Sequence, residues 1–490
     1  MTSGTPTIVW FRQDLRLADN PALQAAITRG GPVIPVFVLD DTTPGRWAPG
    51  GASRWWLHHS LTSLRTDLRA AGSDLVLRRG VGDAVIAALI AETGAQAVTW
   101  NRRYEPTAIA ADEAIKSALR GQGLTVESFN AGLLHEPWSL RSGAGQPYKV
   151  FTPFWKALAA AGDPSAPLDA PSRLPTTRLP PSEALEDWQL LPRKPDWSGG
   201  LRDTWTVGEA AAKRRLADFL DGALASYAED RDRPDRVGTS RLSPHLHWGE
   251  ISPRQVWHWT RKRLRAAAGP NGGTDDSHAW AFLRELAWRE FSAHLLVNVP
   301  SLPDRAWKSS FESFPWADDE TGFLAWSLGR TGYPIVDAGM RELWHCGWMH
   351  NRVRMIAASF LVKHLLVPWQ RGQAWFWNTL VDADLANNAA SWQWVAGSGA
   401  DAAPYFRIFS PVRQGERFDP EGHYVRKWLP ELASVPDRFV HRPWEAPEGV
   451  LEKAGVRLGR DYPAPLVDHA TARKRALAAY ETLKQATAAA

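Results

Sequence analysis

Short apolar runs alternate with helical patterns along the first 130 residues of the chain. The segments between the runs place apolar side chains three or four positions apart, as amphipathic helices do. This alternation predicts an α/β domain with a parallel, doubly wound sheet, which binds ligands beyond the carboxyl ends of its strands. We predict strands within residues 7–11, 33–40, 74–80, 97–101 and 124–130, and helices within residues 20–30, 54–72, 83–94 and 108–123.

The polar segment after the first predicted strand reads FRQDLRLADN, from Phe11 to Asn20. Because it directly follows a parallel strand, we expect it to line the ligand crevice of the sheet. No G-x-G-x-x-G sequence follows this strand, so the fingerprint of a dinucleotide-binding domain is absent.

The pattern changes after residue 130. Nine prolines lie between Pro153 and Pro195, among Ala, Ser and Gly residues, and this composition suits neither helices nor strands. We therefore predict a long interdomain linker over residues 131–204, laid over the surface and interrupted by one short helix within residues 146–158.

Helical patterns dominate from Trp205 onward, and few alternating patterns interrupt them. The sequence therefore predicts three parts: an α/β domain over residues 1–130, the Pro-rich linker over 131–204, and a large all-α domain over 205–490. Predicted helices of the last part lie within residues 208–230, 277–298, 334–366 and 472–486.

Composition narrows the class of protein. A chain of 490 residues is too long for one ordinary core, and 44% hydrophobic with 22% charged residues describes a soluble globular protein. The single cysteine, Cys346, excludes disulfides and cysteine-rich metal sites, so we expect no metal and a reducing, cytoplasmic setting. We see neither a secretory signal nor an apolar stretch of about 20 residues that could span a membrane. The net charge of +4 permits nucleic-acid binding without arguing for it.

Two predicted helix starts lie in the segment GTSRLSPHLHWGEISPRQVW. Ser243-Pro244 and Ser252-Pro253 each place a capping residue before proline at the first helical position. The hydroxyls and glycine just before Ser243 suit a phosphate or pyrophosphate group at a helix N-terminus. Simple helix capping explains the same residues equally well.

Two helical stretches combine polar groups with large apolar side chains. Glu285, Trp288 and Arg289 share one face of a helix, and so do Asn351 and Met355. A surface ion pair over a core ring, and a core methionine beside solvated arginines, are the structural alternatives.

These motifs, in order and spacing, resemble the DNA photolyase/cryptochrome family from Val9 to about Leu432. The resemblance rests on VWFRQDLRLADNPAL, TSRLSPHLHWGEISPRQVW, ELAWREF, GWMHNRVRMIAASFLVKHLL and DADLANNAASWQWVAGSGADAAPYFRIFSP. It implies an α/β antenna domain, a linker and a helical domain that holds FAD. The chain looks most like a bacterial cyclobutane pyrimidine dimer photolyase of the class I type.

The resemblance assigns residues to the flavin. It implies that Asp382 pairs with Arg354 beside the flavin ring, that Asp384 accepts from the ring's polar edge, and that Asn388 faces N5. Many relatives carry Trp at the position of Phe282. Phenylalanine keeps the packing but lacks the indole N–H, which puts one hydrogen bond to FAD in doubt. The complete implied set is Tyr227, Thr239, Ser240, Arg241, Leu242, Ser243, Phe282, Glu285, Asn351, Arg354, Asp382, Asp384 and Asn388.

The resemblance also implies a substrate pocket. Trp288 and Trp394 pack against a dimer flipped out of the DNA, and Glu285 and Asn351 hydrogen-bond to its bases. Met355 stands where (6-4) photolyases carry His, so it favours cyclobutane dimers. Four arginines would grip phosphates around the lesion: Arg231, Arg289, Arg352 and Arg407.

Two further roles follow from the resemblance. Trp392, Trp369 and Trp316 would relay electrons from the surface to the flavin. Glu105, in the stretch NRRYEP, would contact a folate antenna, although a helix-entry turn at Pro106 explains that stretch equally well. The antenna would be methenyltetrahydrofolate or a deazaflavin.

The implied function is light-driven repair of cyclobutane pyrimidine dimers by electron transfer from excited FADH⁻. The implied partner is UV-damaged DNA, bound by a monomer that is cytoplasmic and associated with the nucleoid when on DNA. A cryptochrome photoreceptor is the alternative with the same fold. A flavin-free structural DNA-binding protein is the alternative from another class, and visible absorbance separates it from the first two.

Overall fold

In the computed structural model, which describes residues 4–267 and 276–489, the chain forms two compact units. The first unit comprises Met1–Ala225, Ser240–Pro300 and Val381–Ala386. The second comprises Ser226–Thr239, Ser301–Leu380 and Asn387–Ala490. Neither unit is a continuous stretch of chain, and their limits differ from the three-part division that composition predicts.

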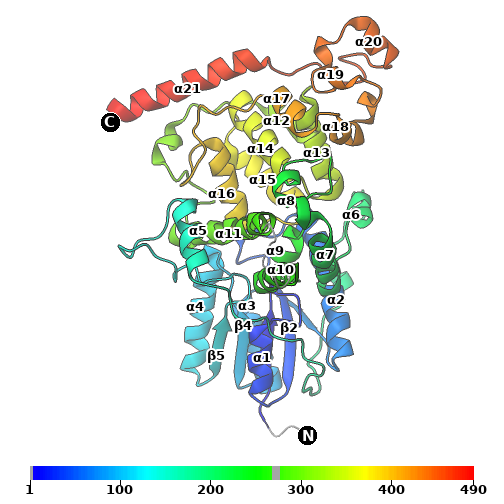
Figure 1. Cartoon of the computed structure of the whole chain (residues 1–490). Helices are drawn as coiled ribbons and strands as arrows, with labels where there is room; N and C mark the ends of the chain where they lie inside the picture. Colours follow the sequence, from blue (N-terminus) through cyan, green and yellow to red (C-terminus); the bar gives the residue numbers. More distant parts are fainter. Residues whose placement is uncertain (1–3, 268–275, 490) are drawn as a thin grey trace. The chain divides into compact units, whose positions relative to one another are not determined.

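A five-stranded parallel sheet forms the centre of the first unit (Figure 1). Its order is β3-β2-β1-β4-β5, so the first strand lies in the middle and the chain winds outward in both directions. In register, Trp10 of β1 lies opposite Val36 of β2 and Trp100 of β4. This confirms the predicted doubly wound α/β fold. The strands are β1 (Thr7–Phe11), β2 (Val33–Leu39), β3 (Val76–Arg79), β4 (Ala97–Asn101) and β5 (Thr125–Phe129).

Four helices connect these strands, and apolar side chains between helices and sheet form a buried core. Asn20 caps the first helix through Leu23 N, and Pro21 occupies its first position. Ile8, Val98 and Leu119 belong to one fully enclosed cluster of this core. The helices are α1 (Pro21–Thr28), α2 (Gly51–Ala70), α3 (Gly82–Thr93) and α4 (Pro106–Gly121).

The first unit continues into helices beyond the sheet. Ser252 and Gln255 form a reciprocal capping box at the start of α10: Gln255 N donates to Ser252 Oγ at 3.0 Å, and Ser252 N donates to Gln255 Oε1 at 2.9 Å. This confirms the second predicted helix start.

The helix predicted within 208–230 is shorter, because α7 ends before Gly222. These helices are α5 (Phe151–Ala160), α6 (Gly199–Thr204), α7 (Glu209–Asp221), α9 (Ser243–His247), α10 (Pro253–Ala267) and α11 (Ser277–Asn298).

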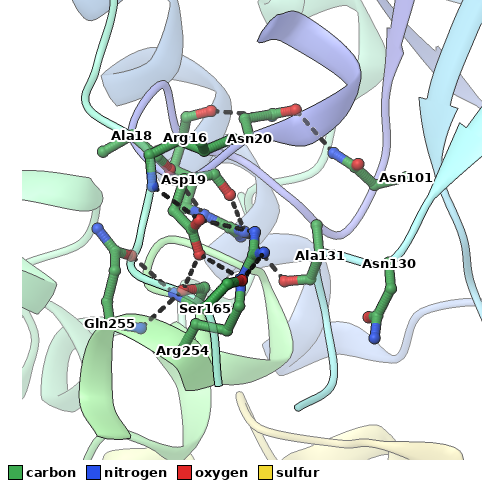
Figure 2. A network of polar contacts seen from close by, with 12 residues as sticks. Arg16, Ala18, Asp19, Asn20, Asn101, Asn130, Ala131, Ser165, Arg254 and Gln255 are labelled. Carbon is green, nitrogen blue, oxygen red and sulfur yellow. Dashed lines mark hydrogen bonds and ion pairs between the residues drawn. The ribbon is translucent and has the colours of Figure 1, made fainter. Parts of the chain in front are cut away.

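A buried polar network occupies the segment after β1 (Figure 2). The fully buried Arg16 donates to the main-chain oxygens of Ala18, Asp19, Ala131 and Gly249 at 2.7–2.9 Å. Arg254 of α10 donates to both carboxylate oxygens of Asp19 at 2.7 and 3.1 Å. These side chains satisfy one another, so this part of FRQDLRLADN fastens the sheet to the helices of its own unit.

A second polar cluster lies near the ends of β1 and β4. Arg12 Nη1 lies 2.7 Å from Asp112 Oδ1, and both groups are buried. Its guanidinium carbon lies 5.0 Å from the ring centroid of Trp10, and Trp100 Nε1 donates to Asp112 Oδ2 at 2.7 Å. An ion pair and two indoles therefore lie near the carboxyl ends of β1 and β4, and ligand binding there stays a prediction.

Helices and loops make up the second unit, and the residues described contain no strand of it (Figure 1). The stretch 334–366 is not one helix as predicted: Gly347 ends α13 in the left-handed conformation, with φ of 62°, and His350 Nδ1 then accepts from Arg352 N to cap α14. A π-helical turn, η5 (Phe360–His364), follows. The remaining elements are α8 (Tyr227–Asp230), α12 (Glu320–Ser327), α13 (Pro334–Cys346), α14 (Asn351–Ser359), α15 (Trp369–Thr379), α17 (Pro411–Phe418), α18 (His423–Trp428), α19 (Asp437–Val440) and α20 (Glu448–Lys453).

Two further helices belong wholly or partly to the second unit. The helix α16 (Leu385–Ala396) begins in the short segment of the first unit and continues into the second. The last helix, α21 (His469–Ala489), buries Ala476 and Leu483 in a cluster with Phe311, Phe314 and Tyr405. No helix in the described residues combines the length and the apolar character needed to cross a membrane.

Candidate functional site

The short segment Val381–Ala386 brings two carboxylates into the first unit. Ser243 Oγ donates to Asp382 Oδ2 at 2.6 Å, and Trp248 Nε1 donates to Val381 O at 3.2 Å. The predicted capping role of Ser243 is therefore wrong: Ser243 is the first residue of α9, and its hydroxyl binds a side chain 139 positions away. Asp382 is thereby fixed in place by residues of the motif that sequence reasoning linked to the flavin.

Asp384 has a histidine neighbour that the sequence did not reveal. His247 Nδ1 lies 3.8 Å from Asp384 Oδ2, and the imidazole is 6% exposed. Within the described residues this nitrogen makes no hydrogen bond. A buried polar atom with no protein partner is costly, so its position beside Asp384 fits the polar edge of a bound group.

An ion pair from the loop after β4 acts on the same carboxylate. Arg103 Nη2 lies 2.7 Å from Glu105 Oε1. Burial lowers the pKa of Arg103, but the carboxylates of Glu105, Asp112 and Asp384 together outweigh it and raise that pKa. Burial alone raises the pKa of Glu105, whereas Arg103 outweighs it and lowers that pKa. Glu105 thus belongs to the electrostatic surroundings of Asp384, and its contact with an antenna stays a prediction.

The stretch Ser240–Ser243 has an unusual backbone. Arg241 adopts a φ of 50°, which costs a non-glycine residue roughly 1–2 kcal/mol, and such strain often lies at functional sites. Leu242 N donates to Ser240 Oγ at 3.4 Å. Leu242 is buried, and the following helix α9 has only five residues. Phosphate binding by this stretch, and by Thr239 of the second unit, stays a prediction.

The helix α11 carries Glu285 and Trp288 one turn apart, both half-buried. The ring of Trp288 stacks face to face on Phe151, with centroids 3.6 Å apart. Phe282, one turn before Glu285, packs on Phe219 with centroids 4.6 Å apart. Glu285 and Trp288 therefore share a face of α11, as the sequence predicts. The contact of Trp288 with Phe151 was not predicted, because Phe151 lies far away in the chain.

Arg289 is engaged within its own unit. Its Nη1 donates to Gly132 O at 2.5 Å and its Nη2 to Leu246 O at 3.4 Å. Two of its donors thus fasten a loop and α9 to α11. This geometry lends no support to a phosphate contact, which for Arg289 stays a prediction.

In the second unit, the amide of Asn388 has a defined orientation. Its Nδ2 donates to the main-chain oxygen of Gln373 at 3.0 Å, and the side chain is largely buried. Because the amino group is committed there, the amide oxygen remains as the acceptor. The side-chain amide of Gln373 itself is fully buried, and neither of its polar atoms has a hydrogen-bond partner in the described residues. The contact of Asn388 with a flavin stays a prediction.

The helix α14 brings together the residues predicted to share its face. Asn351 Nδ2 and Arg352 Nη1 lie 4.0 and 3.9 Å from Met355 Sδ. Arg354 turns elsewhere, donating from Nε to Met349 O at 2.7 Å. Asn351 is exposed and Met355 half-buried, and their contact with a flipped dimer stays a prediction. Trp394, on α16, is half-buried as well.

Two further arginines of the predicted DNA contact belong to the second unit. The guanidinium carbon of Arg231 lies 5.7 Å from the ring centroid of the buried Tyr227, a cation–π contact. Arg407 is exposed to solvent. Both positions are compatible with phosphate binding, which stays a prediction.

Arg352 forms an ion pair that bears on its predicted phosphate contact. Its Nη2 lies 2.8 Å from Asp232 Oδ2, with side-chain exposures of 18% and 32%. We expect Arg352→Ala to lower the slope of log K for DNA against log salt by about 0.9 if one phosphate is contacted. Asp232→Ala, the matched control, frees the guanidinium and strengthens binding at low salt. Slopes for both variants equal to the parent's would remove Arg352 from the DNA contact.

The three predicted relay tryptophans all belong to the second unit. Trp392 and Trp369 are buried, and Trp316 is half-buried against Phe314, with ring centroids 4.4 Å apart. Trp369 makes no ring contact among the described residues, whereas Trp392 meets Trp326 edge-on, with centroids 6.2 Å apart. The backbone of α15 runs beside Trp392, because a Cβ on Gly372 would lie 2.1 Å from its ring.

Comparison with known proteins identifies the chain. Residues 7–172 match the family model of DNA photolyase, and residues 282–482 match the FAD binding domain of DNA photolyase. The chain is 54% identical to a deoxyribodipyrimidine photo-lyase of Agrobacterium fabrum, over 98% of this chain and 99% of that protein. It is 42% identical to cryptochrome-1 of Arabidopsis thaliana, over 96% of this chain and 70% of that protein.

A solved structure gives the same result. The crystal structure of a bacterial class III photolyase from Agrobacterium tumefaciens matches with a TM-score of 0.95 and 53% identity, over 99% of both chains. The α/β sheet and the helical FAD-binding domain thus define a flavoprotein of the photolyase type. The chain belongs to the DNA photolyase/cryptochrome family. The expected class I subclass is not supported, because the similar solved photolyase is of class III.

Proposed function

We propose that this chain is a light-driven DNA repair enzyme that splits cyclobutane pyrimidine dimers. One observation carries the proposal: the amide of Asn388 is held by Gln373 O so that its oxygen is the free acceptor. An acceptor facing N5 suits a flavin that carries a proton there. When bound in its reduced form, FAD supplies the excited electron that opens the dimer.

The residues around the flavin orient it and exclude water. Asp384 accepts from its polar edge, and His247 and the Arg103–Glu105 pair set the charge around that carboxylate. Asp382 is held by Ser243 and completes the first unit's contribution. The pairing of Asp382 with Arg354 is part of the proposal.

The residues of the substrate pocket hold the dimer after it leaves the helix. Trp288 and Trp394 provide apolar walls, and Glu285 and Asn351 hydrogen-bond to the base edges. Met355 contacts the dimer where a histidine would serve (6-4) chemistry. A dimer stacks poorly in DNA, so flipping it costs less than flipping normal bases.

The photoreceptor function is the second candidate. The 42% identity to Arabidopsis cryptochrome-1 favours it. Asn388 argues for repair, since plant cryptochromes typically carry Asp at that position. The antenna chromophore, the monomeric state and association with the nucleoid are further parts of our proposal.

The test uses purified protein with its flavin chemically reduced. The protein is mixed with an oligonucleotide that contains one cyclobutane dimer and is exposed to blue light. We expect loss of the dimer in the light and none in the dark. Binding of FAD without dimer loss would favour the photoreceptor, and a colourless protein that takes up no FAD would exclude both.

Glu285→Ala should lower repair of the same oligonucleotide by roughly tenfold, because the buried base edge then lacks a partner worth about 1–3 kcal/mol. Glu285→Gln offers an acceptor and a donor and should retain more activity. The measurement is the initial rate of dimer loss at saturating light and limiting DNA. Equal rates for the parent and Glu285→Ala would take Glu285 out of the pocket.

A further inference from the structure

A stacked aromatic pair joins the Pro-rich linker to α11. The rings of Phe151 and Trp288 lie 3.6 Å apart at their centroids, with an interplanar angle of 5°. Aromatic pairs usually prefer offset or edge-to-face arrangements. A near-parallel contact at this distance is therefore imposed by the packing around it, and it covers one face of the Trp288 indole.

The surrounding side chains hold Phe151 in that position. Phe151 is 1% exposed, and Phe291 meets both rings edge-on, with centroids 5.8 and 5.9 Å away. The guanidinium carbon of Arg284 lies 5.6 Å from the centroid of Phe151. Arg284, Trp288 and Phe291 recur at i, i+4 and i+7, so Phe151 rests on a single stripe of α11.

Glu285 lies to one side of this stripe. It is one turn before Trp288 and next to Arg284, so Trp288 stands at the margin between the stripe and the face that carries Glu285. With one indole face covered by Phe151, a planar ligand can reach only the other. Trp288 is half-buried, so part of its side chain is exposed.

We propose that Phe151 is a positioning residue for lesion recognition. It fixes the ring plane of Trp288, so that the open indole face is already oriented when the flipped dimer arrives. The proposal rests on the function proposed above, in which Trp288 contacts the dimer. It gives the start of α5 a role in binding damaged DNA that a simple interdomain linker would not have.

Phe154 provides a matched control on the same helix. It is as deeply buried as Phe151 and packs on Phe291 and His294, with centroids 5.2 and 5.3 Å away, but it makes no ring contact with Trp288. Both phenylalanines therefore contribute to the same core. Only Phe151 touches the predicted lesion wall.

The experiment compares Phe151→Leu, Phe151→Tyr and Phe154→Leu as FAD-loaded proteins. The dissociation constants for a dimer-containing oligonucleotide and for its undamaged counterpart are measured in the dark, and repair at saturating DNA is measured in the light. We expect Phe151→Leu to weaken lesion binding roughly three- to tenfold, the value of an aromatic stack, with undamaged DNA unaffected. Repair of bound dimer should change less than binding. Phe151→Tyr, which keeps the stack, should bind the lesion as tightly as the parent protein does.

The preference for the lesion is the dissociation constant for undamaged DNA divided by that for dimer-containing DNA. Phe154→Leu should leave this preference at the parent value. If Phe151→Leu also leaves the preference unchanged, or if both leucine variants lower it equally, the positioning role is overturned. If Phe151→Leu does not fold, Phe151→Met supplies the same loss of the ring. A parent protein that fails to prefer the dimer contradicts the proposed function instead, which distinguishes the two failures.

Discussion

Replacing Trp316 with phenylalanine should slow light-driven reduction of the oxidised flavin by roughly tenfold or more, equivalent to about 1.4 kcal/mol or more in the barrier. Phenylalanine keeps the packing on Phe314 but is much harder to oxidise than an indole. Dimer repair by chemically reduced protein should be nearly unchanged, since the proposed relay would act only in regenerating the reduced flavin. Absorbance during illumination with an external reductant gives the rate.

Trp444→Phe is the matched control for this experiment. Trp444 is a half-buried tryptophan of the same unit that packs on Tyr333, with centroids 5.1 Å apart, and makes no ring contact with the three relay residues. It should photoreduce like the parent. If Trp316→Phe does so too, Trp316 is not the exit of the relay, and the edge-on contact of Trp392 with Trp326 becomes the place to look.

Asp337→Ala should lower the free energy of unfolding more than any other substitution considered. The fully buried carboxylate accepts four hydrogen bonds of 2.6–3.0 Å, from the main chain and hydroxyl of Thr331, from Gly332 N and from Tyr462 Oη. Each buried donor left unpaired costs about 1–3 kcal/mol, so for four donors we expect a total loss of roughly 4 kcal/mol or more.

Thermal unfolding followed by circular dichroism measures this loss, with Asp461→Ala as the comparison. Asp461 is next to Tyr462 in sequence, but its contacts with Arg460 and with Arg457 N are exposed, and exposed contacts contribute little. Asp461→Ala should therefore shift the transition only slightly. A similar shift for both variants would mean that the donors around Asp337 find water or other partners.

Local patterns predicted the elements well and their ends less well. All five strands were placed within a residue or two, because buried parallel strands produce unbroken apolar runs. The long helix predicted over 334–366 failed at Gly347, which continues the apolar pattern on both sides while its backbone turns left-handed. Periodicity detects the buried face of a helix, whereas a C-cap depends on the conformation of one residue.

Partners distant in sequence explain what could not be predicted of the site. The hydroxyl of Ser243 caps no helix because Asp382 competes for it, and nothing near Ser243 in the sequence reveals that carboxylate. Similarly, Arg16 follows a strand at a position typical of ligand contacts, yet it binds main-chain oxygens up to Gly249. The sequence therefore predicts which residue types form the site. It does not predict the contacts that orient them, because those contacts depend on the tertiary fold.

The discontinuous first unit has a consequence for synthesis of the chain. Residues 381–386 leave the ribosome some 250 positions after β5, which at about 5–20 residues per second takes tens of seconds. Until then, the hydroxyl of Ser243 and the indole of Trp248 lack the partners that they have in the finished protein. A translational pause just before Val381 should therefore leave the nascent first unit sensitive to protease and dependent on chaperones. A pause of equal length after this segment has left the exit tunnel should not.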